Sequence, residues 1–162
     1  MNQEIIALAE EAGSLLKKNQ QTIGIAESST GGLVSAHLLG IGGASAYFLG
    51  GSVIYTRFAG REFLGVTDED MEGLRAATEP YARLNAKRVK TLLGSTWGVA
   101  ETGATGPTGN RYGDAAGHTC IAVSGPVSKS ITIETGHTDR KNNMTSFTHS
   151  TLDLLITCLR EC

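Results

Sequence analysis

The stretch AESSTGGLVSAHLLG, residues 26–40, organises the rest of the chain, because it joins an apolar run to an amphipathic helical pattern. The overlapping run TIGIAES, 22–28, is short, apolar and bounded by polar turns, which predicts a buried strand. A helix is expected to begin between Ser28 and Gly31 and to continue through Leu38. Strand followed by helix is the repeating unit of α/β folds, in which ligands bind beyond the carboxyl ends of the strands.

The flanking segments continue this alternation of helices and strands. Three strand-like segments follow one another directly, which indicates a mixed sheet rather than a parallel one. The sequence therefore predicts a single three-layer α/β/α domain over residues 1–162. The other expected elements are a helix at 3–17, a strand FLGGSVIYT, a short helix at 58–64, a helix start at VTDED, a helix at 79–94, the strands TWGVAET, HTCIAVSG and KSITIETG, and a helix at 139–161 with Leu152, Leu155 and Leu159 in the core.

The overall composition argues against several classes of binding partner. Charged residues make up 19% of the chain and the net charge is -2, which argues against a nucleic-acid partner. No apolar run reaches the length of a membrane span, and the N-terminus lacks a signal-peptide pattern, so a cytoplasmic protein without a membrane partner is expected. The three cysteines and four histidines show no metal-ligand spacing, and no metal site is predicted.

The first candidate site lies at the start of the predicted helix. Three hydroxyls stand beside a carboxylate, and the free amides of a helix N-terminus favour a phosphate group. The alternative is that a serine merely caps the helix and the glycines allow tight packing. The residues concerned are Glu27, Ser28, Ser29, Thr30, Gly31 and Gly32.

A second small-residue loop, TGATGPTGN at 102–110, follows another strand. Its backbone amides are candidates for an anion-binding nest, and the alternative is a plain connecting loop. The loop lacks the GK[ST] of a phosphate-binding loop of nucleotide triphosphatases. Two such loops at strand ends in one small domain favour one shared pocket. Tyr55, at the end of the second strand, is a candidate proton relay or a packing residue.

Taken together, AESSTGGLVSAHL, GGASAYFLGGSVIYT, FLGV, ATEP, TGATGP and the late DR resemble the CinA C-terminal-domain family, also described as nicotinamide-nucleotide amidases. The resemblance covers nearly the whole chain, in order and at matching spacing. It implies hydrolysis of nicotinamide mononucleotide to nicotinic acid mononucleotide and ammonia, with no organic cofactor. It also implies a small-molecule nucleotide as the ligand and assembly into a homo-oligomer.

The resemblance assigns roles to particular residues. Ser28 and Ser45, at the family's serine positions, are implied as nucleophile or oxyanion donor, and Tyr55 as proton relay. The two small-residue loops are implied as facing walls of the nucleotide pocket. The implied substrate-binding residues are Glu27, Ser29, Thr30, Gly31, Gly32, Gly103, Ala104, Thr105, Gly106 and Arg140.

The chain departs from the family pattern in places that bear on catalysis. Gly60 stands at the family's lysine, so an amine able to lower the pKa of a hydroxyl is missing, and the neighbouring Arg61 is too basic to replace it. Ala44 replaces the first serine of the family's GSS motif, and Met144 replaces the second arginine before its last helix. The loop TGNRYGDAAGH replaces the family's usual GGxxxKPVGT. Two hypotheses follow: a slow amidohydrolase, or a catalytically impaired relative that binds a small nucleotide or acts as an interaction module.

Overall fold

A five-stranded mixed sheet forms the centre of the computed structural model, which describes residues 1–162. The strand order is β2-β1-β3-β4-β5, with β1, β2 and β3 parallel and β4 and β5 antiparallel to their neighbours. The expected α/β class and mixed sheet are thereby confirmed. The strands are β1 (Ile23–Glu27), β2 (Phe48–Val53), β3 (Trp97–Ala104), β4 (His118–Ser124) and β5 (Lys129–Glu134).

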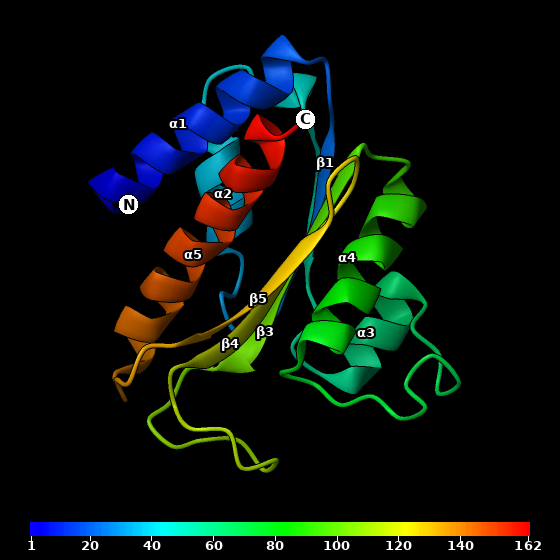
Figure 1. The fold of residues 1–162 in the computed structure, drawn as a ribbon, viewed down its shortest axis with the longest axis vertical. Helices are drawn as coiled ribbons and strands as arrows, with labels where there is room; N and C mark the ends of the chain where they lie inside the picture. Colours follow the sequence, from blue (N-terminus) through cyan, green and yellow to red (C-terminus); the bar gives the residue numbers. More distant parts are fainter.

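Helices cover both faces of this sheet. Figure 1 shows α1, α2 and α5 on one face and α3 and α4 on the other, so that the chain forms three layers. None of the helices is both long enough and apolar enough to cross a membrane. The helices are α1 (Gln3–Lys18), α2 (Leu33–Leu39), a short 3₁₀ helix η1 (Ala44–Ala46), α3 (Arg57–Leu64), α4 (Glu79–Leu93) and α5 (Arg140–Arg160).

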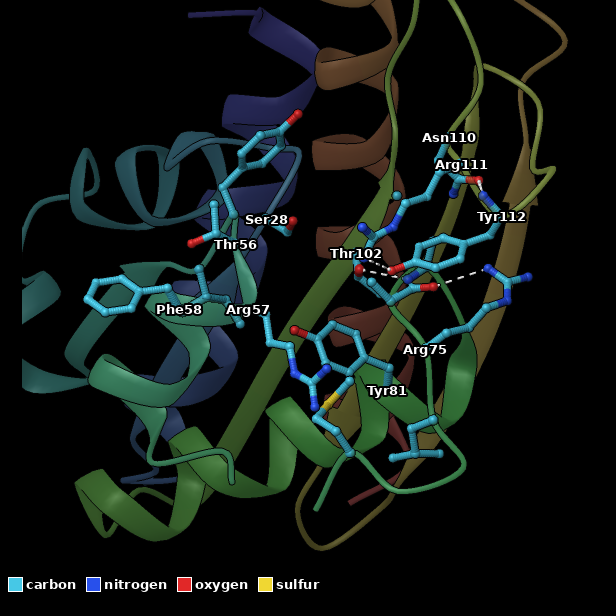
Figure 2. Close-up of a pocket in the computed structure, with 17 residues that line it drawn as sticks. Ser28, Thr56, Arg57, Phe58, Arg75, Tyr81, Thr102, Asn110, Arg111 and Tyr112 are labelled. Atoms are coloured by element: carbon cyan, nitrogen blue, oxygen red, sulfur yellow. Dashed lines mark hydrogen bonds between the residues drawn. The ribbon is translucent and has the colours of Figure 1, made fainter. Parts of the chain in front are cut away.

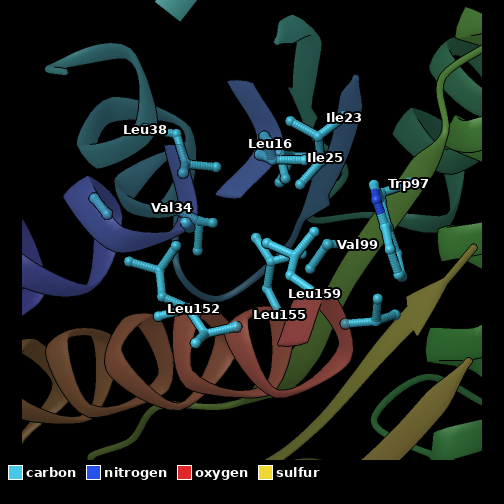
Figure 3. Packing of buried hydrophobic residues seen from close by; sticks show 14 of the residues in the cluster. Leu16, Ile23, Ile25, Val34, Leu38, Trp97, Val99, Leu152, Leu155 and Leu159 are labelled. Atoms are coloured by element: carbon cyan, nitrogen blue, oxygen red, sulfur yellow. The ribbon is translucent and has the colours of Figure 1, made fainter. Parts of the chain in front are cut away.

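The larger apolar core lies between the sheet and the layer formed by α1, α2 and α5. As predicted, Leu152, Leu155 and Leu159 of α5 point into it. Figure 3 shows Leu155 and Leu159 toward Ile25 of β1 and Val99 of β3, and Leu152 toward Val34 of α2. Each fully buried leucine stabilises the fold by about 1.5–3 kcal/mol relative to an exposed one. This core fixes α5 along the sheet. Arg140, the first residue of α5, therefore lies at the edge of the sheet where the parallel strands have their carboxyl ends.

The register of the parallel strands brings the two predicted loops to one edge. Glu27 pairs with Val53 of β2, and Ala26 pairs with Ala100 of β3. The carboxyl ends of β1 and β2 therefore lie side by side, whereas β3 continues past them to Ala104, paired only with β4. Glu101, the first residue of this extension, lies directly beneath the loop that follows β1.

Two local expectations are corrected. The helix after β1 begins at Leu33, later than expected, because Gly31 and Gly32 adopt left-handed backbone angles with φ of 65° and 99°. The segment VTDED at 66–70 forms turns rather than a helix start. Thr67 and Asp70 do exchange the side-chain to backbone hydrogen bonds of a helix cap, at 2.8 and 3.1 Å, but no regular helix follows them.

Candidate functional site

The loop after β1 is organised by a buried carboxyl group below it. Oε2 of Glu101 accepts hydrogen bonds from the backbone amides of Thr30 at 2.9 Å and Ser28 at 3.3 Å. The Ser29 hydroxyl donates to Oε1, and so does Thr119 Oγ1 at 3.0 Å. Burial raises the pKa of Glu101 above its ordinary value, while these hydrogen bonds oppose the shift. The hydroxyls of Ser29 and Thr30 are thus directed into the protein.

A second carboxylate, Glu27, occupies the N-terminus of α2. Its oxygens accept hydrogen bonds from the amides of Gly32 at 2.9 Å, Val34 at 3.1 Å and Ser35 at 2.8 Å, and from Ser35 Oγ at 2.7 Å. The amide of Gly31 donates to the carbonyl of Ser28. Positive partial charge at this helix end is therefore already matched by a carboxylate of the chain itself.

These contacts bear on the binding role predicted for the loop. The amides of Thr30 and Gly32 are bonded to Glu101 and Glu27, and that of Gly31 to the Ser28 carbonyl. The residues that do not line the cleft within this chain are Glu27, Ser29, Thr30, Gly31 and Gly32. The capping alternative is thus closer to the structure, although the cap is a glutamate and not a serine. Gly31 also has a specific neighbour, because a Cβ built on it would lie 3.2 Å from the Met144 methyl group.

Ser28 differs from the other residues of its loop. It is half-buried, it lines the main cleft, and its hydroxyl makes no hydrogen bond within the chain. Its backbone amide is fixed by Glu101 at the same time. The loop thus presents one free hydroxyl, held at a defined position, to a cleft.

That cleft has a volume of about 820 Å³ and opens at the carboxyl edge of the parallel strands. Its charged lining residues are Arg57, Arg75 and Arg111, and no Asp, Glu, Lys or His lines it. Aromatic side chains cover much of the remaining wall. Figure 2 shows Ser28 on one side, Tyr112 on the other and Thr102 between them. In a chain with a net charge of -2, the cleft is a local concentration of positive charge.

Tyr55 and Arg140 meet at the rim beside Ser28. Arg140 Nη2 donates to Tyr55 Oη at 3.3 Å, and Nη1 donates to the Gly106 carbonyl at 2.6 Å. Tyr55 lines the cleft and its side chain is 60% exposed, whereas Arg140 does not line it. The predicted proton relay is therefore close to the cleft, and the predicted binding residue Arg140 positions it.

The second predicted loop contributes less than expected. Thr102 and Gly103 line the cleft, but Ala104, Thr105 and Gly106 do not. The carbonyl of Ala104 accepts from the amide of Gly117 at 2.8 Å, and that of Thr105 accepts from Asn143 Nδ2 of α5 at 2.8 Å. The carbonyls of Thr105 and Gly106 thus bind this loop to Asn143 and Arg140 of α5.

Ser45 is not brought to the cleft within one chain. It lies exposed in η1, before β2, whereas Tyr55 follows β2 at the other end. The six residues of β2 span about 20 Å. Ser28 and Tyr55 therefore lie at one edge of the sheet and Ser45 lies at the opposite edge.

Gly60, at the position of the family's lysine, lies on α3 behind the cleft wall. A Cβ built on it would lie 3.8 Å from Tyr81 Oη, and Tyr81 lines the cleft. The Tyr81 hydroxyl has no hydrogen-bond partner in the chain, and its side chain is almost fully buried. A side chain at position 60 would therefore extend toward this hydroxyl.

The sequence reasoning missed the far wall of the cleft, which is built by Arg75 and the turn 110–114. Asn110 Oδ1 accepts from the amides of Tyr112 and Asp114 at 3.0 and 3.1 Å. Asp114 Oδ2 accepts from Asn110 Nδ2 at 2.8 Å, and Arg75 binds the same carboxylate at 2.7 and 3.2 Å. The hydrogen bond from Arg75, and to a smaller extent that from Asn110, holds the pKa of Asp114 below its ordinary value. The only sequence signal for this turn was NRYGD, in which an Asn and an Asp enclose a segment that contains a glycine.

His118 fastens the segment before α4 to the sheet. Its Nε2 donates to the carbonyl of Ala77 at 2.8 Å, and its Nδ1 bonds to Glu134. Burial alone would lower the pKa of His118, but hydrogen bonds to Glu134 and Ala77 and the charge of Asp114 raise it above its ordinary value. Ala77 lines the cleft with a φ of 59°, and the hydrogen bond from His118 Nε2 to its carbonyl helps to hold this wall in a strained backbone conformation.

Comparison with known proteins identifies relatives that share this architecture. A model of the CinA C-terminal domain matches residues 5–159. A CinA-like protein of Nostoc sp. is 40% identical over 120 residues, which cover 74% of this chain and 28% of that protein. One from a Sulfurihydrogenibium species is 39% identical over 104 residues, covering 64% and 26%. The chain thus spans about a quarter of the length of these relatives.

Solved structures agree with the fold along the whole chain. The competence/damage inducible protein CihA of Agrobacterium tumefaciens has a TM-score of 0.90 at 26% identity, covering 98% of this chain and 97% of that one. A CinA superfamily protein of Klebsiella pneumoniae has a TM-score of 0.91 at 22% identity and covers 100% of both chains. At the latter identity the likeness concerns the fold alone.

Proposed function

The chain belongs to the CinA C-terminal domain family, and we propose that it hydrolyses the carboxamide of nicotinamide mononucleotide, giving nicotinic acid mononucleotide and ammonia. The observation that carries this proposal is the free hydroxyl of Ser28. It faces a cleft in which every charged lining residue is an arginine. A serine hydroxyl can serve as the nucleophile of an amidase, and a cationic, partly aromatic pocket suits a nucleotide.

The proposed reaction uses Ser28 and Tyr55 at one end of the cleft. Ser28 Oγ adds to the carboxamide carbon, and its proton passes through Tyr55 Oη to the departing nitrogen. The C–N bond then breaks and ammonia leaves. Water hydrolyses the serine ester, which releases the acid and restores the hydroxyl. Arg140 supports this sequence because its contact at 3.3 Å fixes the tyrosine hydroxyl.

The same cleft supports a second candidate function, nucleotide binding without hydrolysis. No imidazole, amine or carboxylate lines the cleft to accept the proton of Ser28, since Gly60 replaces the family's lysine. A positioned acid or base contributes about 10²–10⁴-fold to such reactions. We therefore expect the amidase to be slow.

Ser45 enters this scheme only through a second copy of the chain. Its place at the opposite edge of the sheet separates it from Ser28 and Tyr55 of its own chain. The family resemblance implies both a homo-oligomer and a role for Ser45, and the two expectations are compatible if η1 of one copy lies against the cleft of another. Light scattering that gave a monomer at tens of micromolar would contradict this arrangement.

The experiment that tests the proposed function is incubation of the purified chain with nicotinamide mononucleotide. Formation of ammonia and nicotinic acid mononucleotide in equal amounts supports the amidase. Binding of the nucleotide without product supports the second candidate. The absence of both nucleotide binding and product would contradict both candidate functions.

A further inference from the structure

The turn 110–114 presents two side chains at the end of the cleft opposite Ser28. Asn110 and Asp114 close the turn through hydrogen bonds between their own side chains and backbones, and Arg75 clamps Asp114 with two bonds. The residues between them, Arg111 and Tyr112, are exposed at its tip and line the cleft. The base of this turn is therefore tied down, while its tip is free for a ligand.

Arg111 differs from the other two arginines of the cleft because no carboxylate neutralises it. Arg57 pairs with Asp68 at 3.0 Å, and Arg75 pairs with Asp114 at 2.7 Å. Arg111 makes no ion pair in the chain. Its Nη2 donates to Tyr112 Oη at 2.9 Å, and its guanidinium lies 5.0 Å from the centre of the Tyr112 ring.

These contacts restrict Arg111 without using its charge. A guanidinium beside an aromatic ring loses part of its rotational freedom before a ligand arrives, so less entropy is lost on binding. Only one of its nitrogens is engaged, which leaves the planar fork available for a bidentate contact with phosphate oxygens. The Arg75 guanidinium, 5.1 Å from the centre of the same ring, further restricts the position of Tyr112.

We propose that Arg111, oriented by Tyr112, binds the phosphate monoester of a mononucleotide whose base lies toward Ser28. The cleft, at about 820 Å³, is of a size that takes one small ligand. Figure 2 shows Ser28 and the Arg111–Tyr112 pair on opposite sides with Thr102 between them. The orientation of the base rests on the proposed function, whereas the phosphate contact rests on the arginine and the turn.

This assignment also gives the phosphate a binding site that the α2 N-terminus does not supply. The amides of Thr30, Gly32, Val34 and Ser35 there are already bonded to Glu101 or Glu27. Arg111 is the one cation lining the cleft that makes no ion pair, so it is the side chain best placed to supply phosphate-dependent affinity. Arg75 and Asp114 act as positioning residues for the turn.

The test compares two ligands that differ only in the phosphate, nicotinamide mononucleotide and nicotinamide riboside, by titration calorimetry. We expect the mononucleotide to bind at least 10-fold more tightly to the parent chain. Arg111→Ala should weaken it by about 10-fold to 100-fold, as expected for the loss of a charged hydrogen-bonding group, and leave the riboside unchanged. Tyr112→Phe, which removes the bond to Arg111 Nη2, should give a smaller loss of the same kind.

Arg160→Ala is the matched control, because it removes one exposed arginine that pairs with Glu11 at the far end of α5. It should leave the affinities for both ligands unchanged. An unchanged preference for the mononucleotide in Arg111→Ala would overturn the proposal, and so would the absence of any mononucleotide binding at millimolar concentration. Phosphate-dependent binding without ammonia release would refute the amidase and leave this proposal standing.

Discussion

The backbone amide of Thr30 donates a hydrogen bond of 2.9 Å to the carboxyl group of Glu101, 71 residues away in the sequence. This contact joins the loop after β1 to the extended end of β3. It is one of several donors directed at a carboxyl group that is 1% exposed. The place of Ser28 in the cleft therefore depends on a residue of another strand.

Glu101→Ala should lower the free energy of unfolding by about 2–4 kcal/mol, because it leaves buried donors unpaired and opens a cavity. Glu101→Gln should cost less than about 1 kcal/mol. The raised pKa of Glu101 favours the protonated carboxyl, which an amide imitates, and the hydroxyls of Ser29 and Thr119 can turn to accept. Urea unfolding measures both variants, and equal losses would show that an amide does not replace the carboxyl group at this position.

The raised pKa of His118 predicts a dependence of stability on pH. A histidine whose folded-state pKa lies above its unfolded value of 6.5 stabilises the fold fully below pH 6.5 and loses this contribution as the pH rises through the folded-state pKa. His118→Asn should reduce the decrease in the free energy of unfolding with rising pH. Urea unfolding at a series of pH values checks it, and a variant that retained the parent's slope above pH 6.5 would show that other groups produce it.

Gly60→Lys should raise the rate of deamidation by about 10²-fold, because it adds an amine whose side chain extends toward Tyr81 Oη, and burial can lower the pKa of a lysine. Gly60→Ala is the control. Its methyl group makes an ordinary contact at 3.8 Å, and alanine stabilises the helix interior by about 0.5–1 kcal/mol. Steady-state ammonia release measures both, and an equal gain in the two variants would rule out the amine as its cause.

A mixing experiment tests the place of Ser45. If Ser45 acts from a second copy, Ser28→Ala and Ser45→Ala should each reduce ammonia release. A mixture of the two proteins should recover part of it, because some mixed oligomers contain a cleft in which Ser28 of one copy and Ser45 of the other are both intact. A mixture no more active than its components would place Ser45 outside the site. A mixture of Ser28→Ala with Tyr55→Phe, whose residues share one chain's cleft, should show no recovery.

The order of strands and helices could be predicted because buried strands and amphipathic helices leave periodic patterns in the sequence. The edge carrying Ser28 and Tyr55 followed from the rule that ligands bind beyond strand ends. The roles of Glu27 and Glu101 could not be predicted, because a carboxylate that binds backbone amides looks in sequence like one that binds a ligand. The Asn110–Asp114 turn was missed because its partner, Arg75, is distant in the chain.

A comparison of product formation by the parent chain and by Ser28→Ala shows whether Ser28 acts on the carboxamide of nicotinamide mononucleotide. We expect equal amounts of ammonia and nicotinic acid mononucleotide from the parent, at a rate below the enzyme median of about 10 s⁻¹. We expect a loss of at least about 10²-fold in Ser28→Ala with nucleotide binding retained. Product formation at the parent's rate in Ser28→Ala would contradict the claim.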